Sequence, residues 1–161
     1  MWGTLVMKKI IPALLGIIPL VIGGFFLLQH FNGNSDAMIT YIDETNEFTL
    51  AYNELMEQEW AIEDDEELIA FTLEVSIPTV EKLLAESKEY GEAIEKEELR
   101  EIHNILNDAL QKRLDADEAW LAGNDFEAED LFAEVDVLYE EYETSLEKLA
   151  KKWAVEIEWE E

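Results

Sequence analysis

The chain has no cysteine among its 161 residues. It therefore cannot form disulfides, bind zinc through thiolates, use a thiol nucleophile or carry a lipid on cysteine. A bacterial lipoprotein, which needs a cysteine directly after its apolar N-terminal segment, is excluded by the same absence.

Glycine and proline are almost missing after residue 35, where only Gly91, Gly123 and Pro78 remain. Glycine costs backbone entropy inside a helix, and proline removes a hydrogen bond and clashes with the preceding turn. Long stretches without either residue predict long helices that bend or end near these three positions.

Positive charge is also scarce, with 11 Lys and Arg against 39 Asp and Glu. Two lysines precede residue 36 and every carboxylate side chain follows residue 35, so residues 36–161 carry 9 minus 39, or −30. Such a surface repels phosphate backbones and anionic lipid headgroups, which excludes nucleic acid as a partner. Basic proteins, cationic peptides and weakly bound divalent cations remain possible partners. The simpler interpretation, which we favour, is that the charge keeps the domain soluble.

Residues 10–28 form one long apolar run, IIPALLGIIPLVIGGFFLL, without a charged side chain. As a helix rising about 1.5 Å per residue, this run is long enough to cross a hydrocarbon core of roughly 30 Å. Lys8 and Lys9 precede it and the next cation is Lys82. The positive-inside rule therefore predicts a single-pass membrane protein with a cytoplasmic N-terminus and an extracytoplasmic C-terminal domain.

This prediction divides the chain into a cytoplasmic stub (1–9), a transmembrane anchor (10–28), a linker (29–35) and an acidic extracytoplasmic domain (36–161). Cleavage near Ser35 is the rival interpretation and would give a secreted protein, but the apolar run is longer than an ordinary signal-peptide core. Whether translation begins at Met1 or Met7 stays open.

Apolar residues at helical spacing predict four long helices in the acidic domain. We expect them over residues 36–60, 65–90, 96–122 and 126–152. Short connections favour antiparallel neighbours, so the predicted fold class is all-α: a transmembrane helix followed by an antiparallel up-down bundle of three to four long helices. We expect Pro78 to kink or break the second helix near residues 75–77, and a full break would leave three helices and an arm. Gly123 is expected at the C′ position after the third helix.

The last predicted helix has two apolar rows, which indicates burial against two neighbours. The expected seam comprises Ala128, Leu131, Val135, Leu138, Tyr142, Ser145 and Leu149. The second row comprises Phe132, Tyr139, Leu146 and Trp153.

The C-terminal tail changes to a period of two, with Trp153, Val155, Ile157 and Trp159 alternating with smaller or acidic residues. This alternation is typical of a strand, but no second convincing strand accompanies it. The four large residues are candidate groove or partner contacts. Either the tail covers a groove on its own bundle, which we favour, or it adds as a strand to a partner's sheet.

No residue pattern indicates catalysis, a cofactor or a dedicated metal site. His103 lacks a Glu three residues before it, because Arg100 stands there, so it is expected to be a packed structural histidine. Asp115, Asp117 and Glu118 resemble the start of a calcium loop but lack its glycine and its terminal Glu. Asp117 falls on the helix seam, where a Lys or Arg could pair with it.

Several features between Ile77 and Ile157 resemble a pattern in uncharacterised exported helical-bundle proteins of Gram-positive bacteria. They are Pro78 before a helix, Leu99–His103 (LREIH) opening the next, the turn at residues 123–125, and Leu149-Ala150 followed by Val155-Glu156-Ile157. The resemblance implies an exported helical bundle and no activity.

Two functional hypotheses follow. In the first, the acidic bundle is a non-enzymatic module that holds or spaces a protein partner at the envelope. In the second, it binds a small ligand or divalent cations, using an apolar interior lined by polar groups.

Overall fold

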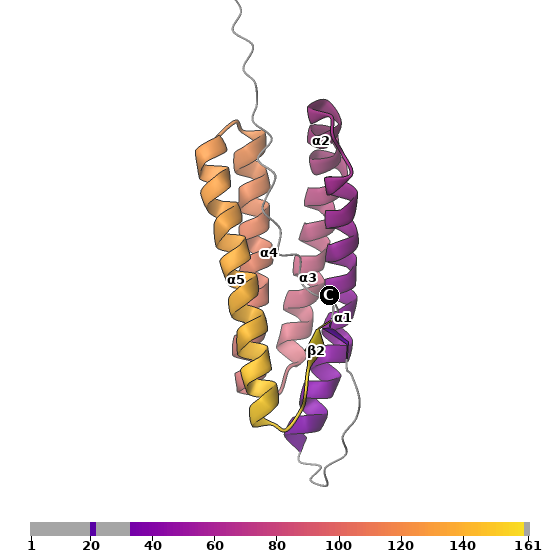
Figure 1. Cartoon of the computed structure of the whole chain (residues 1–161), viewed down its shortest axis with the longest axis vertical. Helices are drawn as coiled ribbons and strands as arrows, with labels where there is room; N and C mark the ends of the chain where they lie inside the picture. Colours follow the sequence, from indigo (N-terminus) through magenta and orange to yellow (C-terminus); the bar gives the residue numbers. More distant parts are fainter. Residues whose placement is uncertain (1–19, 22–32, 160–161) are drawn as a thin grey trace, which may run out of the picture.

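The computed structural model describes residues 20–21 and 33–159 (Figure 1). In chain order the elements are β1 (Leu20–Val21), α1 (Gly33–Trp60), α2 (Asp65–Phe71), the π-helical segment η1 (Thr72–Ser76), α3 (Ile77–Ala93), α4 (Glu97–Leu121), α5 (Asp125–Lys152) and β2 (Glu158–Trp159). Because α2, η1 and α3 follow one another without interruption, the helices of the described part form four rods.

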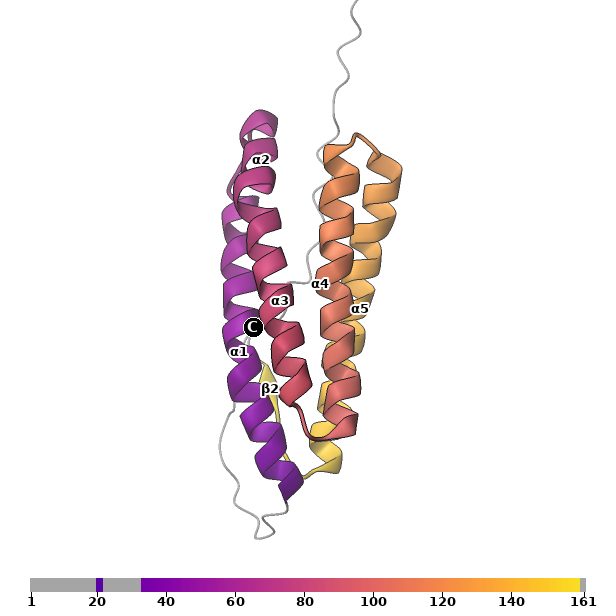
Figure 2. The ribbon, with the colours of Figure 1, turned by 180° about the vertical axis from the view of Figure 1, so that it is seen from behind.

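The four rods run up and down side by side, as Figures 1 and 2 show from opposite directions. The helix α1 lies along α3, α3 contacts α4, and α4 packs along most of α5. The observed helices match the predicted ranges to within three residues at every end, so an all-α helical bundle is confirmed.

The second rod widens at η1 instead of breaking. The Ile77 N–H donates to the Thr72 carbonyl, five residues back, which is the π-helical pattern. Pro78 follows directly, and in a regular helix its missing N–H and its ring would disturb the carbonyl four residues earlier. One widened turn accommodates the ring while the rod continues, so the predicted disturbance falls where expected but produces no break.

Two helices end in the same Schellman geometry. After α4, the Gly123 N–H donates to Trp120 and the Asn124 N–H donates to Ala119. Gly123 has a φ of 77°, as predicted for the C′ residue. After α5, the equivalent C′ position is Ala154, with a φ of 60°, and the Val155 N–H donates to Ala150 at 2.9 Å.

The apolar core fills the space between the rods, and α5 faces it differently from the prediction. Phe132, Tyr139 and Leu146 of the expected second row are buried. Leu131 and Leu138 of the expected seam are only half-buried. The reason is that α5 packs against α4 and also faces α1 across the core. This orientation turns the row of Phe132, Tyr139 and Leu146 towards the core.

The tail has a strand partner that the sequence analysis did not anticipate. Leu20 pairs with Trp159 and Val21 with Glu158 in a short antiparallel ladder. At these two residues the structure has a strand where the sequence predicted a membrane helix. The stub, the remainder of the predicted anchor and most of the linker lie outside the described residues. Within the described ranges, no helix is both long and apolar enough to cross a membrane.

Candidate functional site

A buried polar layer around His103 joins all four rods near the end where α1 begins. The His103 Nε2 lies 2.7 Å from the Ser87 carbonyl, which only accepts, so Nε2 carries the proton. Its Nδ1 lies 3.2 Å from the Tyr41 hydroxyl. The Tyr41 and Tyr142 hydroxyls are hydrogen-bonded at 3.2 Å, and the Ser87 hydroxyl donates to Asn107 at 2.6 Å.

The imidazole of His103 is fully buried, which disfavours its charged form. Burial lowers its pKa below the ordinary value, and the hydrogen bond to the Ser87 carbonyl opposes this only in part. The rings of Tyr41 and Tyr90 meet the imidazole edge-on. Gly91 allows α3 to lie close to α4 at this point, because a Cβ on residue 91 would lie only 2.9 Å from the His103 Cδ2. Gly91 thus lies inside α3, not in the connection expected after it.

A second buried layer surrounds Arg113 towards the opposite end of the bundle. Its Nε donates to both carboxylate oxygens of Asp117 at 3.1 Å, and its Nη2 lies 2.5 Å from a Glu59 oxygen. Ser76 of η1 donates to Asp117 at 3.3 Å. The guanidinium carbon lies 5.2 Å from the centre of the Phe132 ring, which brings α5 into the layer.

This second layer contains two carboxylates and a single cation. Burial raises the pKa of Glu59 and of Asp117, and the nearby Arg113 opposes the rise in both. The paired carboxylates keep the Arg113 pKa well above its ordinary value, although burial acts in the other direction. Asp117 was expected to pair with a cation, whereas the contribution of Glu59, 54 residues before Arg113, was not anticipated.

Both layers are enclosed, and their chemistry is structural. The His103 layer links α1, the second rod, α4 and α5 through directional hydrogen bonds. The Arg113 layer links α1, the second rod and α4 in the same way and reaches α5 through the contact of the guanidinium with the Phe132 ring. A sliding of one rod along another would leave buried polar groups without partners, which costs about 1–3 kcal/mol per group. The two layers therefore fix the alignment of the rods.

Three of the four predicted contact residues of the tail, Trp153, Val155 and Ile157, lie against the bundle. Trp153 is buried in the core, and its carbonyl accepts from the Ser35 hydroxyl at 2.7 Å. Val155 and Ile157 are half-buried and pack against the same core. Trp159 belongs to β2. The tail thus runs back along its own bundle and its backbone pairs with β1.

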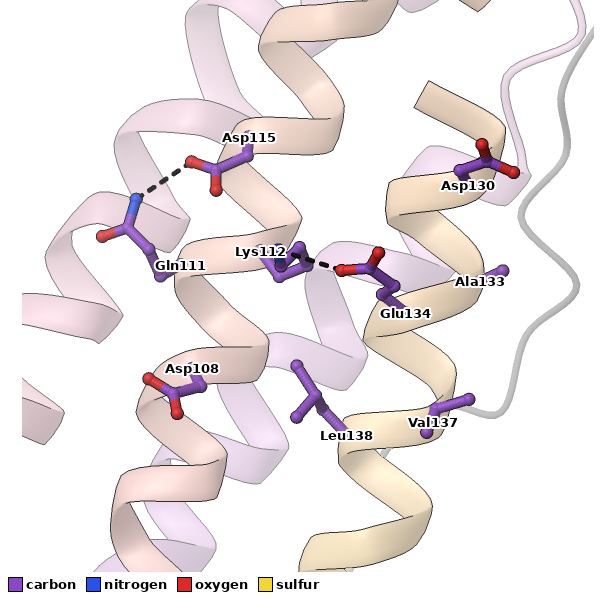
Figure 3. A pocket seen from close by; sticks show the side chains of 9 residues that line it. All are labelled: Asp108, Gln111, Lys112, Asp115, Asp130, Ala133, Glu134, Val137 and Leu138. Carbon is purple, nitrogen blue, oxygen red and sulfur yellow. Dashed lines mark hydrogen bonds and ion pairs between the residues drawn. The ribbon is translucent and has the colours of Figure 1, made fainter. Parts of the chain in front are cut away.

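An open groove runs along the outer side of α4 and α5 and holds about 820 Å³ (Figure 3). Nine residues line it: Asp108, Gln111, Lys112, Asp115, Asp130, Ala133, Glu134, Val137 and Leu138. Figure 3 shows the Leu138 side chain between the two helices, with Val137 and Ala133 on the outer side of α5. Leu138 also packs against the core and so forms the floor.

The groove is acidic, with four carboxylates and one ammonium group in its lining. The Lys112 ammonium lies 2.9 Å from Glu134 and bridges the two helices across the middle. That hydrogen bond raises the pKa of Lys112. The Asp115 carboxylate accepts from Gln111 at 3.2 Å. Asp108 and Asp130 form no ion pair with Lys112 and face solvent.

Sequence reasoning did not identify this groove. Its only signal is the repeat of exposed residues at helical spacing in α5, where apolar residues interrupt an otherwise acidic face. For metals, no group of three His, Cys, Asp or Glu side chains in the searched part of the chain is placed to hold an ion.

Comparison with known proteins gives no match to a family model, a curated protein or a solved structure. The resemblance to exported helical proteins of Gram-positive bacteria therefore stays a prediction, and function has to be argued from the geometry.

Proposed function

We propose that the chain is a membrane-anchored, acidic helical module whose outer domain holds or spaces a protein partner at the cell envelope. The observation that supports this best is the acidic α4–α5 groove on a bundle that two buried polar layers keep in one alignment. Because the helices are already held in one arrangement, the groove loses little conformational entropy when a partner binds.

The charge distribution supports a basic partner. Lys82, Lys112, Lys151 and Lys152 each pair with a glutamate of the bundle, and Arg113 is buried. Of the nine cations in residues 36–161, five therefore form ion pairs within the bundle, against 39 carboxylates. The uncompensated surface attracts cationic proteins and accelerates their encounter.

The anchor at residues 10–28 and the extracytoplasmic orientation belong to the same proposal. Insertion of this segment into a bilayer is incompatible with the pairing of Leu20 and Trp159, so the two placements can be separated by cross-linking. The chain has no cysteine, and Leu20→Cys with Trp159→Cys would form a disulfide only in the paired arrangement. We expect this disulfide to be absent when the chain is in membranes. We also expect protease added to intact cells to digest the acidic domain. Full protection from the protease would refute the orientation.

The partner hypothesis is tested by affinity capture of the full chain from its own membranes after mild cross-linking in cells. We expect a specific basic protein, released by moderate salt because the contact is electrostatic. If an unrelated membrane-anchored domain of equal negative charge captures the same proteins, the proposed function is wrong. For the alternative, binding of a small ligand or divalent cations, no observation in the described part of the structure points to a particular ligand.

A further inference from the structure

We infer that the α4–α5 groove is the docking site for a cationic amphipathic helix of a partner protein. This inference rests on the proposed function and adds to it the surface used and the chemistry of the partner.

The first observation is a row of exposed residues on α5 that is apolar except for one aspartate. Phe126 and Val137 are 88% and 61% exposed, among the largest apolar exposures in the described residues. Phe126, Asp130, Ala133 and Val137 are spaced by four, three and four residues and therefore share one side of the helix. This row spans about 16 Å, or three helical turns, and its members Asp130, Ala133 and Val137 line the groove. Large apolar side chains that cluster at the surface mark interaction sites.

The second observation is the charge around this row. Asp115 and Asp130 stand at one end of the groove, Asp108 stands near the other end, and Lys112 is already paired with Glu134. A partner needs apolar residues that meet Val137 and Phe126. It also needs Lys or Arg beside them that meet Asp108, Asp115 and Asp130, which form no ion pair with Lys112. An acidic or purely apolar segment would leave these carboxylates desolvated without a counter-charge.

The backbone geometry selects a helix as the occupant. Both walls are helices whose backbone groups bond internally, so the groove offers side chains and no open strand edge. An extended segment would find no backbone partners on these walls, whereas a helix satisfies its own N–H and C=O groups. A second copy of the chain is disfavoured because each domain carries −30.

The test uses a designed peptide of about 14 residues, roughly 21 Å as a helix, with leucines at i, i+3, i+4, i+7 and i+11 and lysines elsewhere. Its affinity for the full chain in phosphatidylcholine nanodiscs is measured by calorimetry, with empty discs subtracted. The double variants Phe126→Ser/Val137→Ser and Asp115→Asn/Asp130→Asn should each weaken binding by about tenfold or more, since an apolar anchor or a charge pair is lost.

Matched controls lie on α1, away from the groove. Leu50 is 55% exposed, an exposed fraction similar to that of Val137. Asp43 and Glu57 carry exposed carboxylates. Leu50→Ser and Asp43→Asn/Glu57→Gln should leave the affinity within about twofold, because rim charges elsewhere contribute little. Equal weakening by groove and α1 variants would overturn the inference, since the peptide would then be bound by overall charge.

A local readout places the peptide. A bimane label at Ala133→Cys should shift to shorter wavelength when the peptide binds, whereas a label at Ala85→Cys, exposed on α3, should not change. A shift at both positions, or concentration-dependent dimers in place of a shift, would contradict docking of a partner helix.

The outcome also separates this inference from the proposed function. If the captured membrane partner is retained by Phe126→Ser/Val137→Ser and by Asp115→Asn/Asp130→Asn, the groove inference fails while the module still has a partner. If nothing specific is captured by the wild-type chain, the proposed function itself fails.

Discussion

At the scale of single residues, Arg113 is a buried charge whose burial costs free energy unless its hydrogen bonds are satisfied. Its side chain is 2% exposed, and its guanidinium is surrounded by Asp117, Glu59, Ser76 and the Phe132 ring. A buried charge is tolerated only when its hydrogen bonds are satisfied by partners in good geometry. Here the partners come from all four rods, so the cost of burying Arg113 is offset only in the assembled bundle.

Replacing Arg113 by Met is expected to cost about 3–5 kcal/mol of unfolding free energy at pH 7, because two buried carboxylates lose their cation. The folded-state pKa of Glu59 and Asp117, already raised by burial, should then rise further. A raised carboxyl pKa means that ionisation opposes folding, so the loss should shrink as pH falls from 7 to 5. Urea unfolding at both pH values measures this. The exposed control Lys82→Met should change stability by less than about 0.5 kcal/mol, and an equal effect of both substitutions would contradict the assignment.

His103 should make the unfolding free energy of the bundle fall as the pH is lowered, whereas the loss caused by Arg113→Met should shrink. Its folded-state pKa is lowered by burial, so protonation favours the unfolded chain. The stability it contributes is fully present above the unfolded pKa of about 6.5 and is lost as pH falls through the folded value. The facing titratable groups from α1, α3 and α5 are Tyr41, Tyr90 and, through Tyr41, Tyr142. These tyrosines stay neutral throughout this range.

The measurement for His103 is the unfolding free energy of the wild type relative to His103→Gln between pH 7.5 and 5.5. The wild type should lose its advantage progressively on acidification, since the glutamine cannot titrate. A difference that stays constant over this range would show that protonation of His103 is not linked to folding.

At the scale of helices and connections, the ends of α4 and α5 offer a matched pair of substitutions. Both C′ residues are in the left-handed region, one as glycine and one as alanine. A residue with a Cβ costs roughly 1–2 kcal/mol there, whereas glycine does not. Nothing lies within 4 Å of a Cβ added to Gly123, so its substitution introduces strain and no clash.

Gly123→Ala is therefore expected to lower the unfolding free energy by about 1 kcal/mol, and Ala154→Gly to raise it by about 0.5–1 kcal/mol. Equilibrium urea unfolding of the two variants beside the wild type gives both values. Changes of the same sign in both variants would contradict the backbone explanation.

The C-terminal tail acts as a covering element. Val155 and Ile157 pack on the core and the Val155 N–H completes the end of α5. Deleting residues 154–161 should lower stability by about 2–3 kcal/mol, since full burial of each side chain is worth roughly 1.5–3 kcal/mol and both are half-buried. Circular dichroism melts measure the loss, with deletion of residues 160–161 alone as the control. An unchanged melting temperature after the longer deletion would refute docking of the tail.

At the scale of the whole molecule, self-repulsion acts against the compact state. A charge of −30 on one domain is screened as the Debye length falls from about 30 Å at 0.01 M salt to about 8 Å at 0.15 M. The melting temperature should therefore rise with added sodium chloride. Calcium and magnesium should raise it to similar extents, because no metal group is found in the described residues. A strong preference for calcium at low concentration would reveal a specific site.

The positions and ends of the helices followed from the sequence because they depend on local chemistry. Apolar spacing, the missing N–H of Pro78 and the conformational freedom of Gly123 act within a few residues of where they occur. The acidity of the surface likewise follows from composition alone. Ala154 was missed because alanine carries no local signal for the left-handed conformation that the docked tail imposes on it.

Only the tertiary structure decided which side chains meet. Tyr41 and His103 are 62 residues apart, and Arg113 and Glu59 are 54 apart, so their contacts depend on which helix faces turn towards each other. The same choice buried Phe132 and Tyr139, left Leu138 as the floor of the groove and exposed Val137 beside it. Helical periodicity defines an apolar face only to within a residue or so, whereas the packing of four rods selects the row that is removed from water.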